Sequence, residues 1–287
     1  MSPLPDAYPA LWGAWVALLG ATVGSFLNVV IARVPAGESI VRPGSRCPRC
    51  RTPIRWYDNL PVLSFLLLRA RCRACGARIS LRYPLVEALG AALALVAYLR
   101  QGLSAAAAAE FAFAATLAAL AFIDLDTWLL PNALTWPLIA LGLALSPFGL
   151  TPARSLGMAA LGAGLGFAAF ALVAFLGEKA FKKEALGFGD VWLLAGLGGF
   201  LGPGALLPVV LLASVEGTIV GLALVALGRS EPGPPPREEK AVPGEEEAWV
   251  PPRHAVPFGP FLVAGALEWL WLGGQIVRLV PVLGLFR

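Results

Sequence analysis

Apolar residues occur along the chain in long uninterrupted runs, not in the spaced pattern of a surface helix or the alternation of a half-buried strand. A run of roughly 18 or more apolar residues is long enough to cross about 30 Å of hydrocarbon as a helix. The runs predict spans at 11–32, 83–99, 104–123, 133–150, 155–177, 191–202, 204–228 and 258–274. The sequence therefore predicts an all-α fold, a polytopic membrane helical bundle of about eight spans.

Composition supports the same class of protein. Hydrophobic residues make up 58% of the chain and charged residues only 14%, whereas a soluble domain carries about 25% charged residues to keep its surface wetted. The net charge of +4 does not indicate nucleic acid as a partner, because the basic residues lie in the loops between spans. We therefore expect the lipid bilayer to surround this chain, and no nucleic acid to bind it.

The distribution of arginine predicts the orientation of the spans. From Arg33 to Arg82 inclusive there are eleven arginines against two acidic residues, Glu38 and Asp58. Loops rich in Lys and Arg stay on the cytosolic side of a membrane, so we expect this loop in the cytosol. Counting spans from there places the segments at 124–132, 178–190 and 229–257 on the same side.

All four cysteines lie in that arginine-rich loop. They form two Cys-x-x-Cys pairs, Cys47 with Cys50 and Cys72 with Cys75, separated by 21 residues. Each pair can supply two of the four thiolates of a tetrahedral zinc site, and four thiolates leave no open position for catalysis. The spacing thus predicts a small cytosolic zinc-binding module with a structural Zn²⁺. The alternatives are two redox pairs or simple buried thiols.

Most catalytic arrangements are excluded by the residues that the chain lacks. It has one histidine, His254, which is too few for an HExxH zinc protease. It also contains no G-x-S-x-G elbow and no phosphate-binding loop. Carboxylates are the acid–base groups that remain.

Two acidic sites lie at predicted span ends on the cytosolic side, Asp124 with Asp126 after one span and Asp190 before another. Ionisable groups at membrane depth are costly and indicate function. Two nearby carboxyl groups can share one proton, and such a pair can activate water and protonate a leaving amine. Gly187 and Gly189 would allow a substrate strand to approach. The alternative is that these aspartates only cap helices.

Further motifs carry a resemblance to a known family. They are Gly24-Ser25-Phe26-Leu27-Asn28-Val29-Val30, Asp58-Asn59-Leu60-Pro61, Arg82-Tyr83-Pro84-Leu85-Val86-Glu87, Phe122-Ile123-Asp124-Leu125-Asp126, Gly187-Phe188-Gly189-Asp190 and Pro257-Phe258-Gly259-Pro260-Phe261-Leu262. With the two cysteine pairs, they make the chain similar to type IV prepilin peptidases from about residue 20 to 265.

The resemblance implies a multi-pass enzyme of the bacterial inner membrane with its active site facing the cytosol. It implies cleavage of the basic leader from prepilins and pseudopilins, and N-methylation of the new amino terminus with S-adenosylmethionine. By motif matching, the catalytic aspartates are Asp124, not Asp126, and Asp190. The resemblance does not indicate where S-adenosylmethionine binds or what the oligomeric state is.

The chain departs from the family pattern at two positions. Asn132 replaces an aspartate that is not part of the catalytic pair, and Ala70 replaces a glycine that is associated with methyl transfer. One alternative is therefore a peptidase without methyltransferase activity. Another, from a different class, is a membrane transporter or scaffold that carries a zinc module, although no internal repeat of the transporter type is evident.

The sequence thus divides into five segments. They are a first transmembrane span (1–32), the cytosolic four-cysteine zinc-binding module (33–82), a transmembrane peptidase core with the catalytic aspartate pair (83–228), a flexible proline-rich and acidic cytosolic loop (229–257), and the last span with the C-terminus (258–287).

Overall fold

The computed structural model describes residues 8–181, 187–227 and 256–286. Within these ranges the secondary structure is helical and contains no β-strand, only two isolated bridges. The predicted all-α class is confirmed. His254 and nearly all of the predicted acidic loop lie outside the described residues, so the expectation for that loop stays a prediction.

Eight apolar helices correspond to the eight predicted spans. They are α2 (Pro9–Arg33), α4 (Arg82–Gln101), α5 (Ala105–Thr127), α6 (Asn132–Leu145), α7 (Leu156–Phe181), α8 (Phe188–Leu201), α9 (Leu206–Ala226) and α10 (Gly259–Leu279). The short elements are α3 (Leu63–Leu67) and the 3-10 turns η1 (Trp56–Asn59), η2 (Ser146–Phe148), η3 (Pro203–Ala205) and η4 (Pro281–Phe286).

Six of these helices, namely α2, α4, α5, α7, α9 and α10, are long and apolar enough to cross a membrane. Helices α6 and α8 have only 14 residues each, or about 21 Å at 1.5 Å per residue. They are therefore shorter than the hydrocarbon layer of about 30 Å. Helix α8 tolerates this because ten of its residues are buried in protein.

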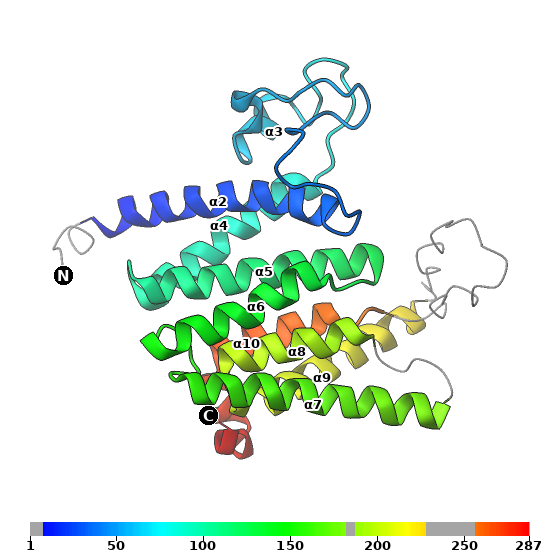
Figure 1. The fold of residues 1–287 in the computed structure, drawn as a ribbon. Coiled ribbons are helices and arrows are strands. Elements are labelled where there is room, and N and C mark those ends of the chain that lie inside the picture. Colours follow the sequence, from blue (N-terminus) through cyan, green and yellow to red (C-terminus); the bar gives the residue numbers. More distant parts are fainter. Residues whose placement is uncertain (1–7, 182–186, 228–255, 287) are drawn as a thin grey trace.

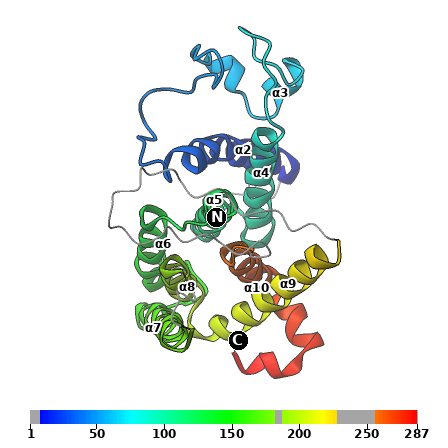
Figure 2. The same cartoon turned by 90° about the vertical axis from the view of Figure 1, so that its right-hand side faces the viewer.

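The eight helices lie roughly parallel and alternate in direction along the chain (Figure 1). Seen along the bundle, α5 lies near the centre, with α2 and α4 on one side of it (Figure 2). Helices α6, α7 and α8 form one group on the other side, and α9 with α10 forms a second. The cysteine-bearing segment lies beyond α2 and α4, outside the bundle (Figure 1).

Helix α5 joins the parts of the core because it is apolar on every face. Phe113, Leu117 and Leu120 are fully buried in a cluster with residues of α8, α9 and α10. Ala119 and Ile123 pack into a second cluster with residues of α2 and α4. A helix that is hydrophobic all round belongs in the centre of a bundle, and this one holds both groups of helices together.

Close contacts between helix backbones depend on glycine. A Cβ atom at Gly198 of α8 would collide with the carbonyl of Gly162 in α7, and one at Gly166 would lie 2.5 Å from the Leu194 carbonyl oxygen. Lipid tails are as apolar as side chains, so membrane helices associate through such tight packing. Small residues therefore fix α7 against α8, and with it the start of α8.

Glutamates within the apolar helices have partners. At the end of the bundle away from the cysteines, the Arg100 guanidinium donates to the buried Glu110 carboxylate at 3.0 Å. The Trp271 indole donates to the same carboxylate at 2.9 Å and thereby ties α10 to α5. Glu216 of α9 and Glu268 of α10 lie close enough to each other to interact.

The glycine contacts lead to a stability prediction. Gly198→Ala should destabilise the protein by about 1–3 kcal/mol, because the added methyl group overpacks the α7–α8 contact. Gly164→Ala is the matched control in α7, since a Cβ there meets open space. We expect a lower melting temperature only for Gly198→Ala, measured by tryptophan fluorescence in detergent. Equal melting temperatures for both variants would contradict the packing assignment.

Candidate active site

Three helix ends meet at the predicted catalytic position. Asp124 lies in the last turn of α5, and its side chain is buried at 5% exposure. Its Oδ2 accepts a hydrogen bond of 3.1 Å from the backbone N–H of Gly259, the first residue of α10. The free N–H groups at a helix N-terminus favour a negative charge. Asp124 is therefore held at the junction of α5 and α10.

Asp190 lies in the first turn of α8. The N-cap residue of that helix is Gly187, and no side chain caps it. The Asp190 Oδ1 is buried and has no hydrogen-bond partner among the described residues. Helix capping thus accounts for part of the Asp124 environment but not for Asp190. The carboxyl groups of Asp190 and Asp124 lie close enough to interact electrostatically.

Two of the glycines near Asp124 and Asp190 allow neighbouring segments of the chain to pack closely. A Cβ at Gly189 would lie 2.7 Å from the Leu130 Cβ, so only glycine lets α8 start beside the segment that follows α5. A Cβ at Gly259 would collide with the Asp124 carboxylate. Gly187 is different, because a Cβ there would lie 3.6 Å from the Asp190 Oδ2, an ordinary contact.

Gly259 belongs to one of the motifs that carry the family resemblance, but the sequence does not predict its contact with Asp124. No spacing in the sequence signals this contact, because the two residues are 135 positions apart. It follows from the packing of α10 against α5.

Asp126 has a different environment from Asp124. It is 42% exposed and forms an ion pair with Arg82, whose Nη1 lies 2.5 Å from the Asp126 Oδ2. The Arg82 guanidinium also lies over the Phe122 ring, 5.2 Å from its centroid. Arg82 is the first residue of α4, directly after the cysteine-bearing segment. The ion pair therefore places that segment and the two buried acids at the same end of the bundle.

The four cysteines come together as their spacing predicts. Their sulfur atoms all lie within 4.8 Å of one another, and the Cys47 and Cys75 sulfurs are 3.9 Å apart. None of them forms a disulfide. Sulfur atoms bound to one zinc ion at about 2.3 Å lie roughly 3.8 Å apart in a tetrahedron. The arrangement can hold a metal ion with only small adjustments.

The two cysteine loops have the same backbone pattern. The Cys47 N–H donates to the Thr52 carbonyl at 3.0 Å, and the Cys72 N–H donates to the Ala77 carbonyl at 2.8 Å. Each loop also closes with one antiparallel bridge. The Cys50 sulfur lies 3.3 Å from the Thr52 hydroxyl oxygen, and hydrogen bonding with Thr52 lowers the pKa of the Cys50 thiol to about 6. Such a thiol is already deprotonated near neutral pH and ready to bind metal.

Arg73 and Asp58 tie the second cysteine loop to η1. The Arg73 Nε and Nη2 both donate to the Asp58 carboxylate, at distances down to 2.6 Å. These hydrogen bonds lower the pKa of the Asp58 carboxyl group. The bidentate geometry is specific, so it fixes the loop that carries Cys72 and Cys75.

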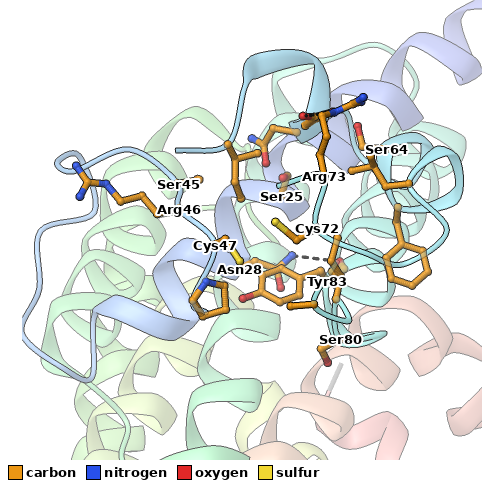
Figure 3. Close-up of a pocket in the computed structure, with 18 of the residues that line it drawn as sticks. Ser25, Asn28, Ser45, Arg46, Cys47, Ser64, Cys72, Arg73, Ser80 and Tyr83 are labelled. Carbon is orange, nitrogen blue, oxygen red and sulfur yellow. Dashed lines mark hydrogen bonds and ion pairs between the residues drawn. The ribbon is translucent and has the colours of Figure 1, made fainter. Parts of the chain in front are cut away.

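A cavity of about 890 Å³ lies between this cysteine-bearing segment and the membrane helices. Side chains of α2, such as Asn28 and Ala32, and of α4, such as Tyr83, line its membrane side. Figure 3 shows Cys47 and Cys72 close to Asn28 and Tyr83 in this space. No pattern in the sequence signals this cavity. Six arginines and two acidic residues also line it: Arg33, Arg46, Arg49, Arg55, Arg73, Arg78, Asp58 and Glu87.

Two buried polar side chains hold the walls of the cavity together. The Asn28 amide donates to the Tyr83 carbonyl at 3.1 Å and links α2 to α4. The Glu87 carboxylate accepts the Val62 N–H at 2.7 Å and so joins η1–α3 to α4. Ala70 has a left-handed backbone with φ of 57°. Glycine adopts this conformation more easily, so the backbone here suits the glycine that the family resemblance led us to expect.

The fold and the site together define a polytopic helical membrane protein with two acidic residues meeting at one end of its bundle and a cysteine cluster that can hold a metal ion. Residues 18–101 match the model of the bacterial peptidase A24 N-terminal domain, and residues 111–222 match that of the type IV leader peptidase family. The chain belongs to the type IV leader peptidase family.

Related proteins cover nearly the whole chain. A prepilin leader peptidase/N-methyltransferase of Myxococcus xanthus is 42% identical over 98% of this chain and 96% of its own length. Proteins with the same name from Burkholderia pseudomallei and Pseudomonas aeruginosa are 36% and 35% identical, over 91% and 96% of this chain and 85% and 97% of their own lengths. No solved structure is significantly similar to the chain.

Proposed function

We propose that the chain is an aspartic endopeptidase that removes the leader peptide from type IV prepilins and pseudopilins, with Asp124 and Asp190 as its catalytic pair. The observation that carries the proposal is that the buried Asp124 carboxyl group and the partly buried Asp190 carboxyl group meet at one end of the bundle, within electrostatic reach of each other. The names of the relatives support the substrate class.

The two carboxyl groups would work with one proton between them. The ionised aspartate takes a proton from a water molecule, whose oxygen attacks the scissile carbonyl carbon. The protonated aspartate donates its proton to the amide nitrogen, which leaves as the new amino terminus when the C–N bond breaks. Asp124 is suited to the charged role, since the Gly259 amide at the N-terminus of α10 stabilises a negative charge. Asp190 is suited to the protonated role, because its Oδ1 has no hydrogen-bond partner in the part of the chain that the structure describes, whereas Asp124 has one.

The orientation follows from charge. The eleven arginines from Arg33 to Arg82 favour the cytosolic side for the cysteine-bearing segment. The Arg82–Asp126 ion pair joins this segment to the end of α5 that carries Asp124. We therefore expect an enzyme of the bacterial inner membrane whose active site faces the cytosol.

Methyl transfer is the second proposed activity, supported by the shared name of the relatives. S-adenosylmethionine would supply a methyl group on a sulfonium, which the new amine attacks. Its size fits a cavity of about 890 Å³, since ligand sites span roughly 300–1,000 Å³. Within the cavity, Tyr83 offers an aromatic face, Asp58 and Glu87 carry carboxylates that suit hydroxyls or a sulfonium, and arginines suit the amino-acid carboxylate.

We propose that the cysteine cluster holds one structural Zn²⁺. Four thiolates favour zinc over harder cations and leave no position for substrate. The cysteine-bearing segment buries few side chains, which supports a folding role for the metal: among its residues from 34 to 81, only Cys47 and Ser64 are buried. Metal binding would then contribute the folding free energy that so small a core does not provide.

The catalytic pair leads to the first prediction for activity. Asp124→Asn and Asp190→Asn should each lower kcat for prepilin cleavage by about 10²–10⁴-fold, because either change removes the shared proton. Asp126→Asn is the matched control and should retain cleavage, since its half-exposed ion pair contributes little. The cleavage rate of the unchanged enzyme should have a bell-shaped pH dependence. Full activity of either catalytic variant would remove that residue from the pair.

Metal content tests the zinc proposal. Elemental analysis should find one zinc per chain, and Cys47→Ser should lose it and melt at a lower temperature, because a three-thiolate site binds zinc more weakly. Ser45→Ala, in the same loop, is the control and should keep its zinc. A protein that lacks metal and melts at the same temperature with or without a strong chelator would contradict a structural role.

Filling the cavity tests where methyl transfer takes place. Ala32→Phe places an aromatic ring on the cavity wall, whereas Ala36→Phe, outside the lining, is the control. We expect Ala32→Phe to lose binding of radiolabelled S-adenosylmethionine and to release cleaved but unmethylated pilin, seen by mass spectrometry. Normal methylation by Ala32→Phe would exclude this cavity. If the unchanged enzyme releases unmethylated product, the chain is a peptidase without methyltransferase activity. This is the alternative that Ala70 suggests.

A further inference from the structure

The cysteine-bearing segment exposes a set of large apolar side chains that no described part of the chain covers. Trp56 of η1 is 79% exposed, and Leu66 and Leu67 of α3 are 64% and 72% exposed. Leu63, one turn earlier on α3, is 51% exposed. We call these four residues the apolar edge. Several large apolar side chains exposed on one short segment indicate contact with another apolar phase or partner.

Local structure turns these side chains outward. The Ser64 hydroxyl is buried and donates to the Tyr57 carbonyl at 2.9 Å, and it accepts the Leu60 N–H at 3.0 Å. Ser64 thus anchors α3 to η1 on the inner side. Leu63, Leu66 and Leu67 follow the i, i+3, i+4 spacing of a single helix face. The exposure therefore belongs to a hydrogen-bonded element and not to a loose loop.

Helix α3, which carries three of the four residues of the apolar edge, lies at the depth of the bundle and not beyond its end (Figure 1). Figure 1 shows α3 outside α2, at the level of the C-terminal half of that helix, while the cysteine loops lie nearer the end where α2 stops. Figure 2, turned by 90°, shows the same segment beyond α2 and α4. Helix α2 is long and apolar enough to cross the membrane, so a segment beside its C-terminal half lies at the level of one leaflet.

Charge and composition agree with a lipid interface. Four arginines flank the apolar edge along the chain and are all exposed: Arg51, Arg55, Arg69 and Arg71. Arginine pairs with lipid phosphates, and tryptophan is enriched where head groups meet acyl chains. Helix α2 is long and apolar enough to span the membrane, and its Trp15 and Leu19 side chains are 55% and 61% exposed. The apolar edge and its flanking arginines thus have the composition of a lipid interface.

We propose that the apolar edge inserts into the head-group region of the adjacent leaflet, so that the cysteine-bearing segment is an interfacial module resting on lipid. Contact between the leaflet and the outer side of the segment would stabilise the position of the segment. It would thereby also stabilise the cavity between the segment and the membrane helices. The inference does not depend on the peptidase assignment, because it concerns only the contact between η1–α3 and the bilayer.

Tryptophan quenching in lipid nanodiscs tests the proposal. The Trp56 contribution to fluorescence is the difference between the unchanged protein and Trp56→Phe, and the Trp15→Phe difference provides a lipid-facing reference. We expect lipids brominated near the head group to quench the Trp56 contribution at least half as strongly as that of Trp15. Acrylamide in the aqueous phase should quench it weakly. Strong acrylamide quenching with no effect of brominated lipid would overturn the proposal.

Two further experiments distinguish lipid from substrate as the partner of the apolar edge. Leu66→Ser with Leu67→Ser should shift Trp56 from lipid quenching to acrylamide quenching, whereas Leu99→Ser with Leu103→Ser, comparably exposed at the other end of the bundle, should not. Normal zinc content of the first variant would show that the module still folds. Protection of Trp56 from acrylamide only after a prepilin is added would assign the edge to substrate, and would overturn lipid contact.

Discussion

Carboxyl groups are costly among membrane helices, and both acids of the proposed catalytic pair lie at helix ends. Asp124 lies where the last turn of α5 meets the first residue of α10, and the Gly259 amide donates to it. Asp190 lies in the first turn of the short helix α8. The end of α5 and the starts of α8 and α10 bring free backbone groups or an ionisable side chain to one place among the helices. An uninterrupted span would not provide such groups there. The proposed chemistry depends on this convergence.

The remaining packing keeps those helix ends in register. Helix α5 contributes to the core on both of its sides, and glycine contacts between α7 and α8 fix where α8 begins. At the other end of the bundle, Arg100, Glu110 and Trp271 join α4, α5 and α10. The Arg82–Asp126 ion pair joins the cysteine-bearing segment to the end of α5 that carries Asp124. One arrangement thus holds the acidic pair and the cavity at the same end.

Much of the fold could be predicted from the sequence because long apolar runs have few alternatives in three dimensions. The ends of the helices were harder to predict. Helix α6 ends at Leu145, before Pro147, although the apolar run continues to residue 150. Helix α8 begins at Phe188, three residues before the predicted start, and so takes Asp190 into its first turn. The cysteine cluster was predictable because two short chelating pairs leave little choice of partners.

The cavity, the Gly259–Asp124 contact and the apolar edge could not be predicted, because each depends on how separate helices and the module lie against one another. The most direct measurement of the central claim is an experimental structure in a lipid bilayer at a resolution that reveals ordered water. The account predicts that the carboxyl groups of Asp124 and Asp190 contact one common water molecule. Carboxyl groups too far apart to contact the same water, with or without bound substrate, would contradict it.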